Sequence, residues 1–151
     1  MNILITRPLM DAEDLMEKLF SYGHKIIHLP TLKISSMETE LINPDNFDAF
    51  VFTSANAVRN LKLTNKSKSV HCFCVGSITE KIAQQSGFVN TSSAGGTVNA
   101  LKNLIMISDK SNKNANFAYF CGDNISYDLD LELKKEGLKI KKIINYSSKA
   151  I

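Results

Sequence analysis

Three short segments of the chain combine hydroxyl, glycine and amide residues where an apolar run gives way to a helical pattern. The clearest is residues 51–58 (VFTSANAV), in which a buried strand is followed at once by Thr53, Ser54 and a helix. The arrangement recurs at residues 74–79 (CVGSIT) and, more loosely, at residues 119–124 (YFCGDN). If the three strands are parallel, the helices that follow them leave unpaired backbone N–H groups on one edge of the sheet. Such an edge suits a large, anionic, oxygen-rich ligand.

The order of apolar and amphipathic runs predicts an α/β fold. Strands are expected at 2–6, 24–29, 32–34, 49–52, 70–75, 88–91, 116–120 and 138–146. Helices are expected at 10–22, 55–63, 78–86, 97–107 and 125–136, and polar loops at 35–47 and 108–115. Strands that alternate with helices are typical of a parallel sheet covered by helices on both faces. In the first helix, we expect the core-facing stripe to be Leu15, Leu19 and Phe20.

Composition argues against several kinds of partner. The 151 residues include 44% hydrophobic and 22% charged residues, which is normal for one soluble domain with a sizeable core. Only Arg7 and Arg59 are arginines, which disfavours nucleic-acid binding despite a net charge of +3. The N-terminus lacks the regions of a signal peptide, and no apolar run approaches the roughly 18 residues of a membrane helix. We therefore expect a cytoplasmic protein that binds no nucleic acid and no membrane.

The cysteines and histidines do not form a metal-binding motif. Cys72 and Cys74 lie two residues apart in one apolar run, Cys121 lies in another, and no second pair has zinc spacing. Buried free thiols in a reducing compartment are the expectation. The three histidines are expected to be structural: His24, His28 and His71. No metal site is predicted.

The chain also carries an ordered set of short motifs. In chain order they are residues 3–8 (ILITRP), Pro30, residues 51–58, residues 75–79 (VGSIT), Gly87-Phe88, the Gly95-Gly96 turn, residues 120–122 (FCG) and residues 143–146 (IINY). In this order, and with compatible gaps, the set resembles the uroporphyrinogen-III synthase family. The resemblance covers nearly all of the chain but only a little over half of the family's usual length.

The resemblance implies two flavodoxin-like domains joined by a two-stranded ladder, with the second domain inserted into the first. It assigns residues 1–33 to an incomplete N-terminal part of domain one, residues 34–147 to a complete domain two, and residues 148–151 to the start of the return linker. The expected fold class is therefore α/β: a flavodoxin-like parallel sheet with helices on both faces, plus an N-terminal βαβ fragment of a second flavodoxin-like domain. The chain is expected to be a truncated form.

The resemblance also implies a reaction, which belongs to tetrapyrrole and heme biosynthesis. The substrate is the linear tetrapyrrole hydroxymethylbilane, a small molecule with eight carboxylates. A hydro-lyase and cyclase of this family removes the terminal hydroxyl, inverts ring D and releases uroporphyrinogen III and water. Because unassisted closure gives the uninverted isomer, conformational control matters as much as rate. No metal or organic cofactor is implied.

The family's roles fall on residues that match its motifs. Tyr146 is the candidate catalytic residue, as the donor of a proton or hydrogen bond to the departing hydroxyl; the alternative is an aromatic side chain packed against the sheet edge. Arg7 is expected to hold a substrate carboxylate, or else to cap a turn at the surface. The other substrate-binding candidates, which could equally be helix caps and tight turns, are Thr53, Ser54, Ala55, Gly76, Ser77, Thr79 and Gly122.

Two rival interpretations stay open at this point. A truncated chain could be a non-catalytic remnant or a tetrapyrrole-binding module, and its incomplete domain one would pair with a second copy, as a homo-oligomer or by segment exchange. A flavodoxin-like phosphoryl acceptor or nucleotide binder is disfavoured. A phosphoryl acceptor needs clustered aspartates at its strand ends, whereas Asp123 is a single one, and no glycine-rich fingerprint follows the first strand.

Overall fold

The chain forms two compact units in a computed structural model, which describes residues 1–108, 110 and 114–151. Unit 1 contains Met1–Ser35 and Ser147–Ile151, and unit 2 contains Ser36–Tyr146. Part of the loop predicted at 108–115 lies outside the described residues.

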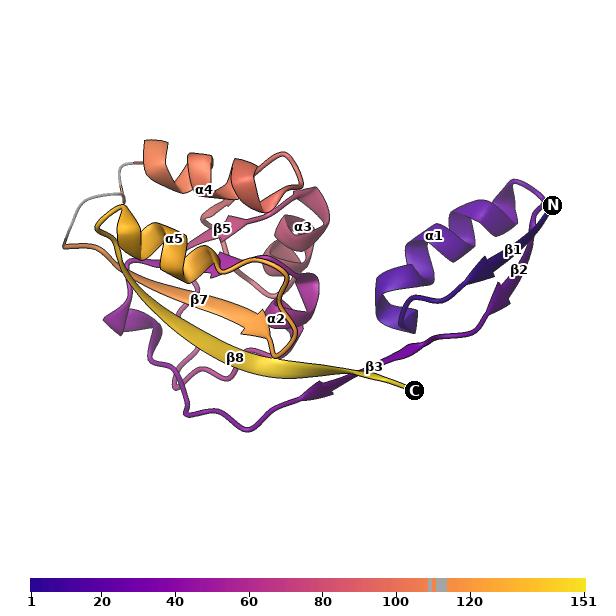
Figure 1. Ribbon diagram of the computed structural model, residues 1–151, viewed down its shortest axis with the longest axis horizontal. Helices are drawn as coiled ribbons and strands as arrows, with labels where there is room; N and C mark the ends of the chain where they lie inside the picture. Colours follow the sequence, from indigo (N-terminus) through magenta and orange to yellow (C-terminus); the bar gives the residue numbers. More distant parts are fainter. Residues whose placement is uncertain (109, 111–113) are drawn as a thin grey trace. The chain divides into compact units, whose positions relative to one another are not determined.

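Strands and helices alternate along most of the described chain (Figure 1). The strands are β1 (Asn2–Ile5), β2 (Lys25–His28), β3 (Leu32–Ser36), β4 (Ala49–Phe52), β5 (His71–Cys74), β6 (Thr91–Ser93), β7 (Asn116–Gly122) and β8 (Lys139–Ala150). The helices are α1 (Leu9–Ser21), the 3-10 helix η1 (Pro44–Asn46), α2 (Ala55–Arg59), α3 (Ser77–Gln85), α4 (Val98–Ile107) and α5 (Leu129–Lys135).

Unit 2 is built on five parallel strands in the order β8-β7-β4-β5-β6. The central strand β4 is fully buried and reads AFVF, because a strand covered on both faces has no solvent side to alternate with. β3 completes a six-stranded sheet beside β8. It runs antiparallel to β8, since the Met37 N–H donates to the Asn145 carbonyl (3.1 Å) and the Ile151 N–H donates to the Thr31 carbonyl (2.9 Å).

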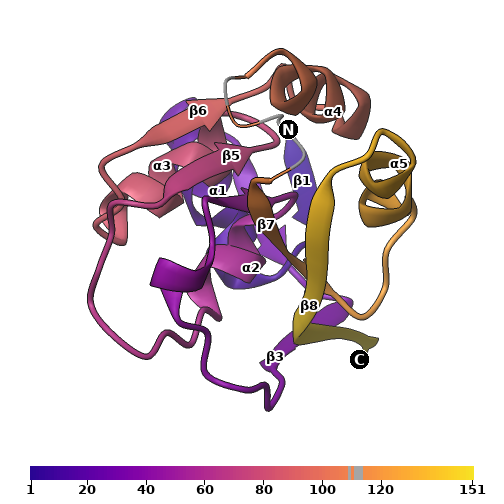
Figure 2. The ribbon, with the colours of Figure 1, turned by 90° about the vertical axis from the view of Figure 1, so that its left-hand side faces the viewer.

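Helices cover both faces of the unit 2 sheet (Figure 2). On one face, Ala57 and Val58 of α2 and Ala83 of α3 join the core cluster of Phe50 and Phe120. On the other face, α4 and α5 pack against β7 through a second cluster that includes Leu101, Ile105, Leu129, Leu133 and Phe117. The doubly wound α/β sheet predicted from the sequence is therefore confirmed.

Four phenylalanines dominate the cluster beneath α2 and α3. The rings of Phe50 and Phe120 meet edge to face with centroids 4.9 Å apart, and Phe52 stacks on Phe120 at 5.5 Å. Phe88 closes the group at 6.1 Å from Phe50. Aromatic contacts of this kind add to the large apolar area that each ring removes from water.

We predict that Phe50→Ala lowers the free energy of unfolding of unit 2 by about 3–5 kcal/mol, because the variant leaves a cavity in a packed core. Urea denaturation followed by circular dichroism measures the change. The matched control is Phe20→Ala, whose ring is 73% exposed. A loss for Phe50→Ala no larger than that of the control would contradict this account of the core.

Unit 1 pairs β1 with β2 in parallel and places α1 beside them. Ile5 is buried, whereas the paired residues Leu4 and Ile27 of the opposite face are exposed. The predicted core stripe of α1 is wrong in part. Phe20 is 73% and Leu15 is 41% exposed, and Ala12 is the buried residue of this helix. The apolar pattern identified the helix correctly, but it did not determine how much of the apolar side would be covered.

Several predicted boundaries moved for local reasons. The strand predicted at 88–91 is observed at Thr91–Ser93, because the turn that follows α3 includes Phe88, whose N–H donates to the Ala83 carbonyl (3.2 Å). Gly87, with φ at 103°, makes this helix-ending turn. The helix predicted at 55–63 ends at Arg59, and the one predicted at 125–136 begins at Leu129.

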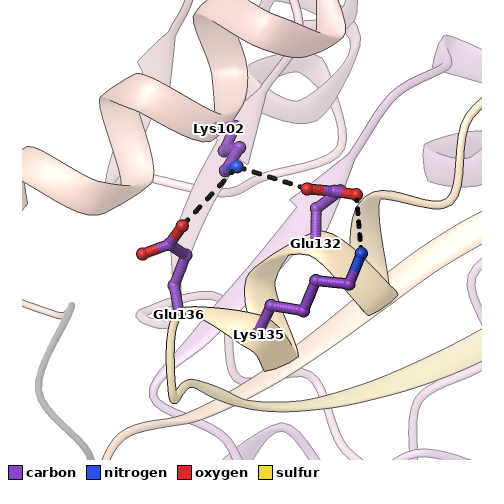
Figure 3. A network of polar contacts seen from close by, with 4 residues as sticks. All are labelled: Lys102, Glu132, Lys135 and Glu136. Carbon is purple, nitrogen blue, oxygen red and sulfur yellow. Dashed lines mark hydrogen bonds and ion pairs between the residues drawn. The ribbon is translucent and has the colours of Figure 1, made fainter.

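An ion-pair network joins α4 to α5 (Figure 3). Lys102 lies 3.5 Å from Glu132 and 3.8 Å from Glu136, and Lys135 lies 3.4 Å from Glu132. The charge of Lys135 is the largest cause of a lowered pKa of the Glu132 carboxyl. Because these groups are partly exposed, the network contributes little to the stability of the fold.

Within the described residues, no helix combines the length and the apolar character that crossing a membrane requires.

Candidate functional site

The carboxyl ends of the parallel strands share one edge of the unit 2 sheet, here called the carboxyl edge. It is formed by the residues that follow β4, β5, β6 and β7, together with Tyr146 of β8, which pairs with Gly122. The order of the strands reverses at β4: β5 and β6 are added on one side of it and β7 and β8 on the other. Accordingly, α2 and α3 cover one face of the sheet, whereas α4 and α5 cover the other. In doubly wound sheets, ligands bind outside the strand ends at this reversal point.

At the β4 junction, a serine side chain caps the start of the following helix. Ser54 has an extended backbone (φ −153°, ψ 143°), and its Oγ accepts from the Asn56 N–H at 3.1 Å. Ser54 is therefore the N-cap of α2, as one of the two sequence interpretations expected. Ala55 follows it in the first turn and is 9% exposed.

Thr53, the other hydroxyl residue of this junction, forms a hydrogen bond with a buried tyrosine. Its Oγ1 lies 3.4 Å from the Tyr119 hydroxyl, and Tyr119 is 1% exposed. Burial is the largest cause of a raised pKa of Tyr119, which reaches about 12. The phenol is thus neutral at physiological pH and shares a hydrogen bond with Thr53.

The β5 junction differs, because Gly76 is the N-cap of α3 and has no side chain to bind the first-turn N–H groups. Gly76 lies close to the turn after β6: a Cβ at Gly76 would meet the Gly96 Cα at 3.4 Å. Ser77 is exposed in the first turn, whereas Thr79 is 5% exposed and faces the interior. The first turn of α3 thus has no side-chain cap, and its acidic residue is Glu80.

The β7 junction holds Tyr146 against a glycine. A Cβ built on Gly122 would lie 2.7 Å from Cε2 and Cζ of Tyr146 and 3.0 Å from its hydroxyl oxygen. The Asp123 N–H donates to the Tyr146 carbonyl at 3.1 Å, so the backbones also meet here. Only a residue without a side chain lets the tyrosine ring lie this close to β7.

Most of the predicted site residues thus lie together on one edge. They are Thr53, Ser54, Ala55, Gly76, Ser77, Thr79, Gly122 and Tyr146, although the side chains of Ala55 and Thr79 are buried. Arg7 belongs to unit 1, where it is exposed and its carbonyl lies 2.8 Å from Nε2 of His28. The sequence-based prediction missed Tyr119, which looks like an ordinary core residue of an apolar run. It also missed Asn145, a polar residue inside the strand IINY.

The described residues contain no group of three or more His, Cys, Asp or Glu side chains that could hold a metal ion. Cys72, Cys74 and Cys121 are free and buried. Burial raises the pKa of all three thiols, that of Cys74 to about 12. They are therefore protonated and poorly nucleophilic at neutral pH.

Comparisons with known proteins agree with this geometry. The sequence profile described as uroporphyrinogen-III synthase HemD matches residues 13–151. The chain belongs to the uroporphyrinogen-III synthase family. The family expected from the motifs is therefore confirmed. No curated protein sequence matches the chain significantly.

Solved uroporphyrinogen-III synthases share the fold at low sequence identity. The uroporphyrinogen-III synthetase of Helicobacter pylori aligns with a TM-score of 0.59 and 20% identity, over 85% of this chain and 57% of that one. A mutant enzyme of the extremely thermophilic bacterium Thermus thermophilus aligns with a TM-score of 0.57 and 13% identity, over 99% and 63%. The wild-type Thermus enzyme gives 0.54 and 15%, over 99% and 63%. The chain thus spans less than two thirds of each of these proteins.

We predict that Gly122→Ala displaces the Tyr146 ring, because a Cβ cannot stay 2.7 Å from two ring carbons. Overpacking of this kind should cost about 1–3 kcal/mol of unfolding free energy. The cost should largely vanish in a Tyr146→Ala background, and a double-mutant cycle by urea denaturation measures the coupling. Gly95→Ala is the control, since a Cβ there would make only an ordinary 3.9 Å contact with Ala100. Equal costs in both backgrounds would contradict the close packing.

We also predict that stability falls as the pH rises from 10 to 12, because the folded chain keeps Tyr119 neutral up to about pH 12 whereas the ordinary tyrosine pKa is 10.0. The raised pKa stabilises the fold fully below pH 10, and this stabilisation is lost as pH approaches 12. A shift of this size corresponds to about 2–3 kcal/mol. Unfolding free energies of Tyr119→Phe should depend less on pH in this window than those of the control Tyr127→Phe, whose ring is partly exposed. The same pH dependence in both variants would show that the Tyr119 pKa is not raised.

Proposed function

We propose that the chain acts as a uroporphyrinogen-III synthase. It would bind hydroxymethylbilane at the carboxyl edge of unit 2 and close it to uroporphyrinogen III with loss of water. The observation that carries the proposal is the packing of Tyr146 on Gly122 at the carboxyl edge, one strand away from the point where the strand order reverses. The Tyr146 hydroxyl is carried by β8, which adjoins β7. The next strand is β4, which is followed by Thr53 and Ser54.

Carboxylate binding in this proposal depends on backbone donors rather than on a cluster of arginines. The first turn of α3 has no side-chain cap at Gly76, so its N–H groups and the exposed Ser77 can hold a substrate carboxylate. Thr53 supplies a hydroxyl that Tyr119 orients. The side chains of Ala55 and Thr79 are buried, so these two residues would bind substrate through the backbone N–H groups of their helix turns.

Catalysis would begin with the departure of the terminal hydroxyl. The Tyr146 hydroxyl donates a hydrogen bond or proton to the leaving oxygen, water departs, and an azafulvene-like electrophile forms. Ring D then closes in inverted orientation, through a spiro intermediate. The carboxyl edge contributes mainly by holding the linear substrate in a conformation in which the reacting atoms of the inverted closure lie close together. None of these steps requires a metal or an organic cofactor.

Three further expectations stay predictions at this stage. Arg7 of unit 1 is still expected to hold a carboxylate. Pairing of two copies, by homo-oligomerisation or segment exchange, is favoured by the exposed Leu4, Phe20 and Ile27 of unit 1. A cytoplasmic location fits three free, buried cysteines.

The proposal is tested by supplying freshly made hydroxymethylbilane to the full chain and resolving isomers I and III. We expect isomer III from the wild type, and a loss of kcat of about tenfold or more for Tyr146→Phe, a scale typical of a positioned acid. The control is Tyr22→Phe, an exposed tyrosine of unit 1, which should keep the wild-type rate. Isomer I alone, formed at the uncatalysed rate, would refute the activity.

A tetrapyrrole-binding module without catalysis is the second candidate. It is favoured by one observation, that the chain spans 57% to 63% of the solved enzymes with which it aligns. Quenching of uroporphyrin III fluorescence on titration with the chain, combined with isomer I alone in the assay above, would support the module. Isomer III formation would exclude it.

A further inference from the structure

A bulge interrupts β8 next to the proposed catalytic tyrosine. Cys121 of β7 pairs with Ile144, but the following residue, Gly122, pairs with Tyr146. Asn145 is therefore the additional residue of the bulge. Bulges often occur beside active sites, where they redirect a side chain.

The bulge brings two successive side chains of β8 to the same side of the sheet. Ile143 pairs with Phe120 and belongs to the cluster under α2 and α3. Strand alternation assigns Asn145 to this side as well. Tyr146 packs against the same cluster, which is the face of its partner Gly122. The amide and the phenol are thus adjacent on one face.

Asn145 is 2% exposed, and its side chain binds α2, which covers the same face of the sheet. Its Nδ2 donates to the Ala57 carbonyl of α2 at 2.9 Å. Its own backbone carbonyl accepts from the Met37 N–H at 3.1 Å. Among the described residues, its Oδ1 has no hydrogen-bond partner. The Nδ2 bond to Ala57 is therefore the hydrogen bond by which this buried amide is held.

The acceptor explains why an amide stands at this position. Helix α2 ends at Arg59, so Ala57 is one of the last residues whose carbonyls lack a helical partner. The N–H of Leu61, which would bind the Ala57 carbonyl in a longer helix, instead donates to Val58 (3.3 Å). Asn145 caps the Ala57 carbonyl from another strand. The bond therefore ties the bulge that carries Tyr146 to the helix that Ser54 begins.

We propose that Asn145 is a positioning residue for Tyr146. Its amide holds the β8 bulge against α2 and thereby fixes the tyrosine ring over Gly122. The kinetic part of this inference rests on the function proposed above. The structural part does not, because it concerns the orientation of Tyr146 in the free protein.

The structural test labels the full chain with 3-fluorotyrosine, whose four ¹⁹F resonances correspond to the four tyrosines of the sequence. Tyr146→Phe identifies the Tyr146 signal. Asn145→Leu, which keeps the branched shape of the side chain but removes the donor, should shift or broaden this signal and leave those of Tyr22 and Tyr127 unchanged. Asn145→Asp, of nearly identical shape, serves if the leucine variant does not fold. A Tyr146 signal identical to that of the wild type in the folded variant would overturn the proposal.

The control is Ile140→Ala, in the same strand but in the other core cluster. It should lower stability and leave the Tyr146 signal in place. A displacement of the signal as large as that in Asn145→Leu would mean that any loss of stability moves the ring, and it would also overturn the proposal.

Kinetics then separates positioning from folding. In the isomer assay, Asn145→Leu should lower kcat about tenfold with KM within about twofold, as expected when a proton donor is misaligned but binding persists. Ile140→Ala should retain the wild-type kcat. Unchanged kcat in a variant with a displaced Tyr146 would refute the kinetic role. If the wild type forms no isomer III, the proposed function fails, whereas the ¹⁹F spectra still decide whether Asn145 positions Tyr146.

Discussion

Parallel pairing of β4 with both β5 and β7 is the constraint on which the candidate site depends. Because the three strands run in the same direction, their ends at Phe52, Cys74 and Gly122 reach one edge of the sheet. The helices that follow leave in opposite directions from β4 and β7, so neither covers the edge between them. The residues of the junctions have different roles. Ser54 caps α2, Gly76 leaves α3 without a side-chain cap, and Gly122 leaves room for the Tyr146 ring.

Much of this arrangement could be predicted from the sequence because its signals are local. An apolar run such as 49–52 followed by Thr53 and Ser54 identifies both the end of a buried strand and a helix cap within a few residues. The partners of the site could not be predicted in the same way. Tyr119 reaches Thr53 across 66 residues, and Asn145 reaches Ala57 across 88. Nothing near either residue in the sequence specifies these contacts, which exist only once β7 and β8 have joined the sheet.

The same limit explains the error in α1. Apolar periodicity shows which side of a helix is apolar, but burial depends on the element that packs against that side. In unit 1, α1 has a two-stranded sheet beside it; Phe20 is largely exposed and Leu15 is 41% exposed. In unit 2, the helices have a five-stranded parallel sheet to cover, and their apolar residues Leu101, Ile105 and Leu129 are fully buried. The two units thus differ in the area of sheet that is available for helix packing.

The uncapped start of α3 has a thermodynamic consequence. Gly76 has no side chain that could cap the N–H groups of the first turn of α3. A carboxylate bound there would act as the missing cap, so part of its binding free energy would be recovered as local order in the helix. Binding of a carboxylate and ordering of the first turn of α3 would then be coupled. Slowed amide hydrogen exchange at residues 77–79 would therefore detect binding without a measurement of turnover.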